Sequence, residues 1–134
     1  MEFTIGDAYY FLVDVPPKPK PKYCILVSQE DNFLHFLLVN TEINCMFTSS
    51  SLFRPYFIQI DVASHPFLDY DSFVDCNFPK KIIRDDVEAI FSVKEGRHCG
   101  PISGEMISKI IAALRETPAL DPVQKKAYIH SLNP

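Results

Sequence analysis

The sequence of 134 residues has no tryptophan, only 4 glycines and no excess of positive charge. Its few glycines are too dispersed to build a GxGxxG or GxxxxGK[ST] loop, which excludes nucleotide-binding enzymes that hold phosphates in such loops. With 13 Lys and Arg against 17 Asp and Glu, the formal net charge is −4. Proteins that coat nucleic acid usually have a basic domain, so this balance leaves room only for a local basic site.

Neither a long hydrophobic run nor the pattern of a secretory leader is recognisable in the sequence. The run from Phe33 to Val39 is among the longest without a charge, and it falls far short of the roughly 20 residues that a membrane span needs. The first residues include Glu2 and lack the basic head that precedes the apolar part of a signal peptide. We therefore expect a soluble, cytoplasmic protein with no membrane partner.

The 4 cysteines show none of the close spacings that bind zinc. Cys24, Cys45 and Cys76 lie in or beside apolar runs, where a reduced cysteine behaves as a small buried hydrophobe. Cys99 follows His98, and a turn before a helix explains that pair as well as a metal ligand does. We expect reduced thiols, no bound metal and no cofactor.

Aromatic and β-branched residues, in contrast, are abundant, with 11 Phe and 6 Tyr. They form short runs bounded by proline and polar residues, a pattern typical of strands. The run 33–40 is apolar on both of its faces, which predicts a central strand covered on two sides. The other predicted strands are residues 8–13, 23–28, 56–61 and 72–76.

The last third of the chain has a helical pattern. Asp85 and Asp86 predict the start of a short helix, and Ser103 is a good N-cap for a second one. Asp121, followed by proline at the first helical position, predicts the start of a third. Strands followed by helices indicate an α+β fold, with antiparallel strands, over a parallel βαβ sheet.

We therefore predict a single domain over residues 1–134. A small, partly open antiparallel β-barrel of about five strands occupies residues 1–83, and a helical annex follows in residues 84–134. The helix around Met106–Leu114 is expected to lie across the barrel.

Three lysines, Lys18, Lys20 and Lys22, alternate with prolines in residues 16–22. The prolines predict an extended, exposed loop that neither pairs in a sheet nor enters a helix. Alternate residues of an extended segment project to the same side, so the three ammonium groups are placed to meet successive phosphates. Alternatively, the lysines only solvate the loop and protect a sheet edge.

Asn40 and Thr41 follow the predicted central strand, where side chains are held rigidly yet exposed. Thr41 can donate a hydrogen bond to a phosphate, or it can be a turn residue that bonds its own backbone. If residues 23–28 and 33–40 form a hairpin with its turn near Asp31, paired positions sum to about 62 or 63. Lys22 then lies opposite Asn40 or Thr41.

His65 is the remaining candidate for chemistry. A serine and several aspartates lie near it in the sequence, but their spacing does not distinguish a catalytic triad. No serine stands in a GxSxG motif, so a hydrolase of that kind has no support. The alternative is a structural role, in which His65 bonds a backbone carbonyl at a corner that Pro66 fixes.

Three segments together resemble the PemK/MazF-like toxins of bacterial toxin–antitoxin systems. They are Gly6-Asp7 at the start of a strand, residues 22–28 (Lys-Tyr-Cys-Ile-Leu-Val-Ser), and the strand end Val39-Asn40-Thr41. Lys22 and Tyr23 stand where those toxins have Arg-Pro. The segment from His65 to Val74 is similar to a motif of a divergent PemK-like subgroup whose chain also continues into helices.

The resemblance implies an SH3-like β-barrel, commonly a homodimer, that is bound by a cognate antitoxin protein and cleaves single-stranded RNA without a metal. Such cleavage needs a proton acceptor, a proton donor and a cation near the phosphate. The resemblance implies that Lys22 supplies the cation and a proton and that Thr41 bonds the phosphate. Lys18 and Lys20 would contact the RNA backbone, with Asn40 as a further substrate-binding residue. Among the catalytic candidates, His65 is the histidine to test as the proton acceptor.

A second function from another class stays open. Lysine lacks the planar fork with which arginine binds a phosphate through two hydrogen bonds. The same SH3-like domain could therefore be a non-catalytic module that binds a protein partner, and the acidic balance of the chain favours this alternative.

Overall fold

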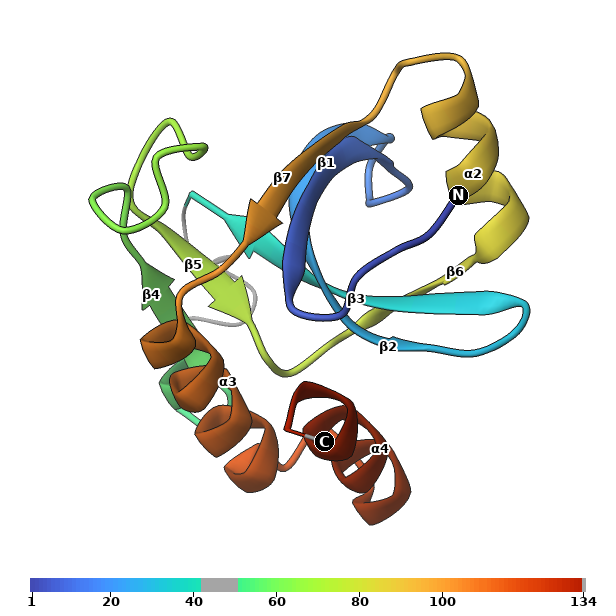
Figure 1. Ribbon diagram of the computed structural model, residues 1–134. Coiled ribbons are helices and arrows are strands. Elements are labelled where there is room, and N and C mark those ends of the chain that lie inside the picture. The colour runs from blue at the N-terminus through green and yellow to red at the C-terminus, as the bar shows by residue number, and fades with distance from the viewer. Residues whose placement is uncertain (42–50, 134) are drawn as a thin grey trace.

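The computed structural model describes residues 1–41 and 51–133, and an antiparallel sheet lies at its centre (Figure 1). The described residues form a 7-stranded sheet in the order β4-β5-β3-β2-β1-β7, in which β6 pairs with β3 beside β5. All of these pairs are antiparallel. The strands are β1 (Asp7–Val13), β2 (Lys20–Gln29), β3 (Phe33–Asn40), β4 (Phe57–Ile60), β5 (Ser72–Asp75), β6 (Lys80–Ile83) and β7 (Arg97–Pro101).

The hairpin of β2 and β3 has the predicted register. Tyr23 lies opposite Val39, and Gln29 lies opposite Leu34 after a register shift between Leu26 and Ser28. The pairs therefore sum to 62 before the shift and to 63 after it, as the position of the turn required. A one-residue slip would have moved every buried side chain to the other face.

Two hydrophobic clusters cover the two faces of the sheet, because successive residues of a strand point to opposite faces. Along β1, Ala8 faces the cluster under α3 and α4, whereas Tyr9 faces the cluster under α2. This arrangement confirms that β3 is a central strand with two covered faces. The helices are α2 (Arg84–Ser92), α3 (Gly104–Glu116) and α4 (Pro122–Leu132), and a 3-10 turn, η1 (Arg54–Tyr56), precedes β4.

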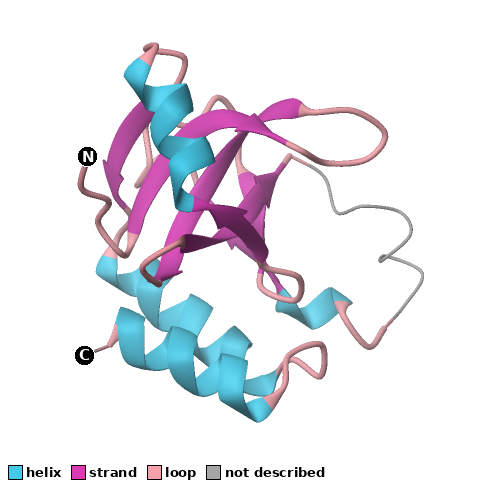
Figure 2. Ribbon diagram, turned by 90° about the vertical axis from the view of Figure 1, so that its right-hand side faces the viewer, coloured by secondary structure: helices cyan, strands magenta, loops and turns pink. Residues whose placement is uncertain are grey.

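The two clusters differ in composition. The cluster under α2 is rich in aromatic rings, with Tyr9, Phe11 and Phe36 all nearly inaccessible. The cluster under α3 and α4 is mainly aliphatic and includes Ile110 and Leu114 of α3. Figure 2 shows α3 and α4 packed side by side against one side of the sheet, where they cover this aliphatic face.

The predicted helix starts at Ser103 and Asp121 are confirmed. The Ser103 side chain accepts a hydrogen bond from the Met106 backbone N–H, and Asp121 forms a capping box with Gln124. Asp85 and Asp86 lie in the first turn of α2 and do not cap it. Acidic residues there still interact favourably with the helix dipole.

Among the described residues the sheet is open and has seven strands, whereas the prediction was a partly open barrel of about five strands. Within residues 1–41 and 51–133, its ends are the edge strands β4 and β7, each of which pairs with one neighbouring strand. The helices α3 and α4 cover the aliphatic face of the sheet. The prediction also missed β6 and β7, and β7 lies in the stretch expected to be helical.

The predicted exclusion of residues 20–22 from the sheet is also wrong. β2 begins at Lys20, and Lys20 and Pro21 pair with Val13 and Leu12 of β1. Proline is tolerated near the start of a strand, where its missing N–H need not serve a second neighbour. Lys20 and Lys22 therefore belong to strand β2, whose pairing with β1 fixes their backbone, and they do not lie in a free loop.

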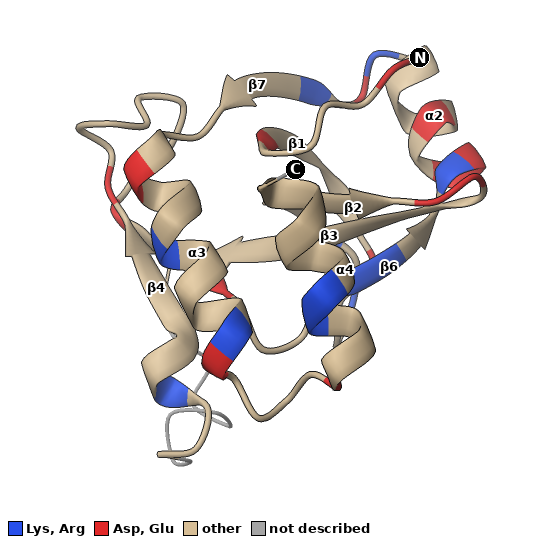
Figure 3. Ribbon diagram, turned by 60° about the horizontal axis from the view of Figure 1, so that its bottom comes forward, with Lys and Arg blue, Asp and Glu red and all other residues tan. Residues whose placement is uncertain are grey.

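Cys24 and Cys76 are free thiols with no exposed surface, as predicted. Burial raises the pKa of both thiols far above the ordinary value. Cys99 is a free thiol with intermediate exposure, and Cys45 lies outside the described residues. Basic and acidic residues are interspersed on α2 and α3 (Figure 3), in keeping with the overall charge balance.

Candidate functional site

A cavity at one end of β2 and β3 contains three of the six residues predicted to act on RNA. It has a volume of about 330 Å³, and its lining includes Lys20, Lys22 and Thr41. Residues of β1 and of the segment 68–72 complete its wall, among them Asp69 and Tyr70. We call this space the Lys22 cavity. The proximity of Lys22 and Thr41 follows from the hairpin register, as predicted.

Asn40, a fourth predicted residue, holds Lys22 in place. The Lys22 ammonium donates a hydrogen bond to the side-chain oxygen of Asn40, across the hairpin. Lys18 is exposed in the connection between β1 and β2 and is not part of the cavity lining. Of the three lysines predicted to form a row, only Lys20 and Lys22 line the cavity.

The Lys22 ammonium is partly buried, and burial lowers its pKa. The neighbouring charge of Lys20 lowers that pKa further, whereas Cys24 opposes the shift. Desolvation has this effect because it disfavours the charged form of a lysine. A lysine with a lowered pKa gives up its proton more readily, so this group is suited to donate a proton as well as to bind an anion.

A guanidinium group outside the predicted set of site residues lies beside the cavity. Arg97 of β7 donates a hydrogen bond of 2.8 Å to the Tyr23 hydroxyl, and its guanidinium carbon lies 4.9 Å from the centre of the Tyr10 ring. Tyr10 and Tyr23 both line the cavity. Arg97 and Tyr23 are 74 residues apart, so no local pattern could have brought them together.

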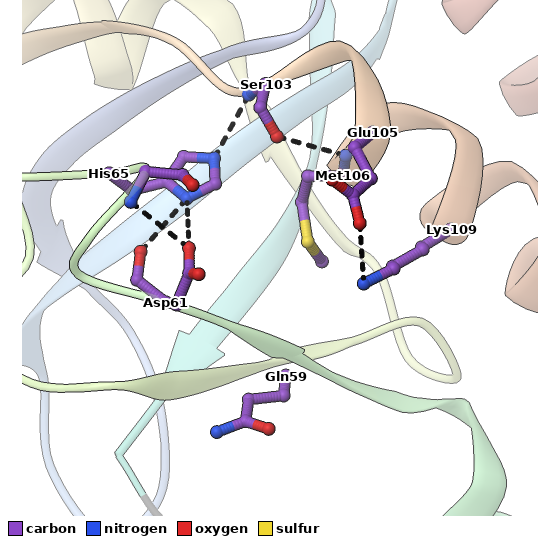
Figure 4. A pocket seen from close by; sticks show the side chains of 8 residues that line it. Gln59, Asp61, His65, Ser103, Glu105, Met106 and Lys109 are labelled. Carbon is purple, nitrogen blue, oxygen red and sulfur yellow. Dashed lines mark hydrogen bonds and ion pairs between the residues drawn. The ribbon is translucent and has the colours of Figure 1, made fainter.

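His65, the sixth predicted residue, lines a different cavity of about 140 Å³, which we call the His65 cavity (Figure 4). The residue is only 2% exposed, and both ring nitrogens have partners. Its Nδ1 lies 3.0 Å from the Asp61 carbonyl oxygen and 3.4 Å from the Asp61 carboxylate, and its Nε2 accepts a hydrogen bond of 3.0 Å from the Ser103 backbone N–H. A ring that donates at one nitrogen and accepts at the other is neutral.

These contacts match the structural role considered for His65, in which the ring bonds a backbone carbonyl at a corner. The ring connects the corner after β4 to the residue that caps α3, so it fixes the start of the helix relative to the sheet. The opposite wall of the His65 cavity carries an ion pair of 3.3 Å between Glu105 and Lys109. The structure therefore does not bring His65 to the Lys22 cavity.

A second histidine stabilises the edge of the sheet. His98 of β7 lies 2.6 Å from the buried Asp7 carboxylate of β1 and stacks on the Tyr9 ring at 4.7 Å. Asp7 follows Gly6, whose φ of 91° is a conformation that favours glycine. This pair ties β7 to β1 and so helps to place Arg97 next to Tyr10.

Comparison with known proteins does not assign a family or a function to this chain. No protein-family model matches it, and no curated protein matches it. Within residues 1–41 and 51–133, no helix has the length and apolar character needed to span a membrane. The same residues contain no group of three His, Cys, Asp or Glu side chains placed to hold a metal ion.

Proposed function

We propose that the Lys22 cavity binds a phosphate of single-stranded RNA and that the chain is an endoribonuclease toxin of a toxin–antitoxin system. The observation that supports this proposal is the gathering of two lysines and a threonine hydroxyl in one cavity. The lysines attract the phosphate, and the hydroxyl can donate a hydrogen bond to it. The resemblance to PemK/MazF-like toxins involves these same residues.

The proposed reaction is attack by a ribose 2′-oxygen on the adjacent phosphorus. A bond forms between the 2′-oxygen and phosphorus while the bond to the 5′-oxygen breaks, which gives a cyclic phosphate and a free 5′-hydroxyl. Lys22 stabilises the negative charge that develops on the phosphate oxygens and donates the proton that the departing 5′-oxygen needs. Thr41 bonds a phosphate oxygen, Lys20 attracts the neighbouring phosphate, and Asn40 positions Lys22.

The reaction also needs a group that accepts the proton of the 2′-hydroxyl. We assign this role to Asp69, because it supplies the carboxylate among the residues that line the Lys22 cavity. Asp69 and Tyr23 line the same cavity. Burial raises the pKa of the Tyr23 phenol, Arg97 opposes this shift, and the Asp69 charge adds to it. His65 has no part in the proposed mechanism, because both of its nitrogens bond backbone groups elsewhere.

The proposal includes several properties that the toxin resemblance implies. The hairpin sheet would correspond to an SH3-like core, opened and extended by the two helices that cover it. A cognate antitoxin protein would cover the Lys22 cavity, and two copies of the chain would form a homodimer in the cytoplasm. Because the net charge is −4, RNA binding would depend on the local basic site at the Lys22 cavity.

One observation favours the second candidate, a non-catalytic module that binds a protein. Among the described residues that line the Lys22 cavity none is a histidine, and Asp69 is an exposed carboxylate. A cavity of this kind can hold a partner through Tyr70, which is 68% exposed, without promoting any reaction. RNA cleavage is the property that separates the two candidates.

The decisive experiment compares the wild type with Lys22→Ala, Thr41→Ala and a matched control, Lys126→Ala on the exposed side of α4. Growth and RNA integrity are followed together after induced expression in a bacterium, and binding to single-stranded RNA is measured with the purified proteins. We expect Lys22→Ala to reduce cleavage by about a hundredfold or more. RNA affinity should fall as salt is added, because bound counterions are released.

The control should cleave RNA like the wild type. If the wild type neither binds nor cleaves RNA at low salt, or if Lys22→Ala and Thr41→Ala cleave as fast as the control, the ribonuclease proposal is wrong. The protein-binding module then takes its place.

A further inference from the structure

A row of side chains crosses the sheet next to the Lys22 cavity. Arg97 lies opposite Tyr10, and Tyr10 lies opposite Tyr23. Residues directly opposite each other on antiparallel strands project to the same face of the sheet. Arg97, Tyr10 and Tyr23 therefore form a continuous row over β7, β1 and β2, which we call the tyrosine row.

Contacts within the tyrosine row hold its members in place. The rings of Tyr10 and Tyr23 lie 4.5 Å apart at an angle of 46°, and the Arg97 guanidinium lies over both. The Tyr23 hydroxyl donates a hydrogen bond of 2.8 Å to the Phe67 carbonyl and accepts one from Arg97. A surface fixed in this way loses little conformational freedom when a ligand binds.

The tyrosine row is accessible, unlike the aromatic cluster on the other face of β1. Arg97 is exposed and both tyrosines are partly exposed, whereas Tyr9 is 1% exposed. Among the ion pairs of the described residues, none involves Arg97, so its charge is not balanced by a protein carboxylate there. The row thus combines aromatic surface with an available positive charge.

We propose that the tyrosine row is a base-binding subsite for the nucleotide next to the phosphate held at Lys22. This inference rests on the proposed function. Unpaired bases stack on aromatic rings and on guanidinium groups, and such stacking tolerates any base. In a duplex the faces of the bases are already stacked on one another. The row would therefore select single-stranded over double-stranded RNA without selecting a particular base.

The test uses two ligands that differ only in their bases. One is a short 2′-O-methyl oligouridylate, which cannot be cleaved because its 2′-oxygens are blocked, and the other is an abasic strand of the same length and backbone. Binding is followed through tyrosine fluorescence, which is readable because the chain has no tryptophan. The dissociation constants of both strands are measured at one low salt concentration.

We expect the wild type to bind the oligouridylate roughly five- to a hundredfold more tightly than the abasic strand. Tyr10→Leu should reduce that ratio towards one, whereas Tyr10→Phe, which keeps the ring, should retain it. Arg97→Ala should also reduce the ratio and weaken binding of the abasic strand, since a positive charge is lost. Circular dichroism identifies any variant that fails to fold. If Tyr10→Leu fails to fold, Arg97→Ala still tests the loss of the ratio, and Tyr10→Phe still tests whether the ring alone retains it.

Two results would overturn the inference. If the abasic strand binds as tightly as the oligouridylate and its binding needs Lys22, the tyrosine row binds no base while the proposed phosphate site stands. The tyrosine row is also not a base-binding subsite if a duplex of 2′-O-methyl RNA binds as tightly as the single strand. If neither strand binds the wild type, the phosphate site and the base-binding subsite are both wrong.

Discussion

The Lys22 cavity and the His65 cavity differ in what their polar groups are already bonded to. At the His65 cavity, the imidazole is almost inaccessible and both nitrogens bond backbone groups of the corner and of the α3 N-terminus. At the Lys22 cavity, the ammonium is only partly buried and bonds a single side chain, that of Asn40. The first arrangement holds the fold together, whereas the second leaves hydrogen-bonding capacity for a ligand.

This difference shows why residue type alone does not identify a site. Histidine is the usual proton acceptor in proteins, yet here its acceptor nitrogen is occupied by a backbone N–H. Lysine is usually a solvated surface residue, yet here burial perturbs its pKa, which is frequent at functional sites. The number and kind of existing partners is the better guide.

The largest expected effect that would sharpen the comparison of the two cavities is the loss of RNA cleavage when Asp69 is replaced. Replacing it with Asn removes the proposed proton acceptor, so we expect RNA cleavage to fall by about a hundredfold to ten-thousandfold. RNA binding should be retained or improve, because a negative charge near the bound phosphate is removed. Single-turnover cleavage and equilibrium binding, measured on the same protein, separate the two effects. Cleavage at the wild-type rate would exclude Asp69 from the mechanism.

The second effect concerns the stability that His65 contributes. His65→Ala leaves the Ser103 N–H and the Asp61 carbonyl without their partner and opens a small void, so the free energy of unfolding should fall by about 2–4 kcal/mol. Urea unfolding measures this change, with His130→Ala on the exposed side of α4 as a control expected to stay within about 0.5 kcal/mol. RNA cleavage by the folded variant should match the wild type. A stable variant that has lost cleavage would break the comparison and restore His65 as a catalytic residue.

The smallest effect concerns the cost of burying Lys22. Because burial lowers the pKa of Lys22 in the folded state, the unfolded chain binds a proton more tightly, and stability should rise with pH between the lowered pKa and about 10.4. In Lys22→Met this contribution is absent. Relative to that variant, the wild type should therefore gain a small amount of stability as the pH rises through this window. Parallel urea titrations at several pH values measure the difference, and a difference that does not change with pH would contradict the shift.

Local patterns in the sequence determined the strands β1 to β5, the register of the hairpin and two of the helix starts. In each case the decisive contacts are close in the chain: the turn near Asp31 sets the pairing of β2 with β3, and Ser103 and Asp121 bond backbone groups within the next turn. The proximity of Lys22 to Asn40 and Thr41 follows from that register. This half of the candidate site could therefore be predicted from the sequence.

The tertiary structure alone decided the other half. Arg97 reaches Tyr10 and Tyr23 because the short strand β7 pairs with β1 from the far end of the chain. His65 is separated from Lys22 because its Nε2 bonds the backbone at Ser103, where α3 begins. The described part of the sheet is open, and α3 and α4, from the far end of the chain, cover its aliphatic face. Such long-range pairings depend on which surfaces fit together after the local elements form, and no periodicity within one segment carries that information.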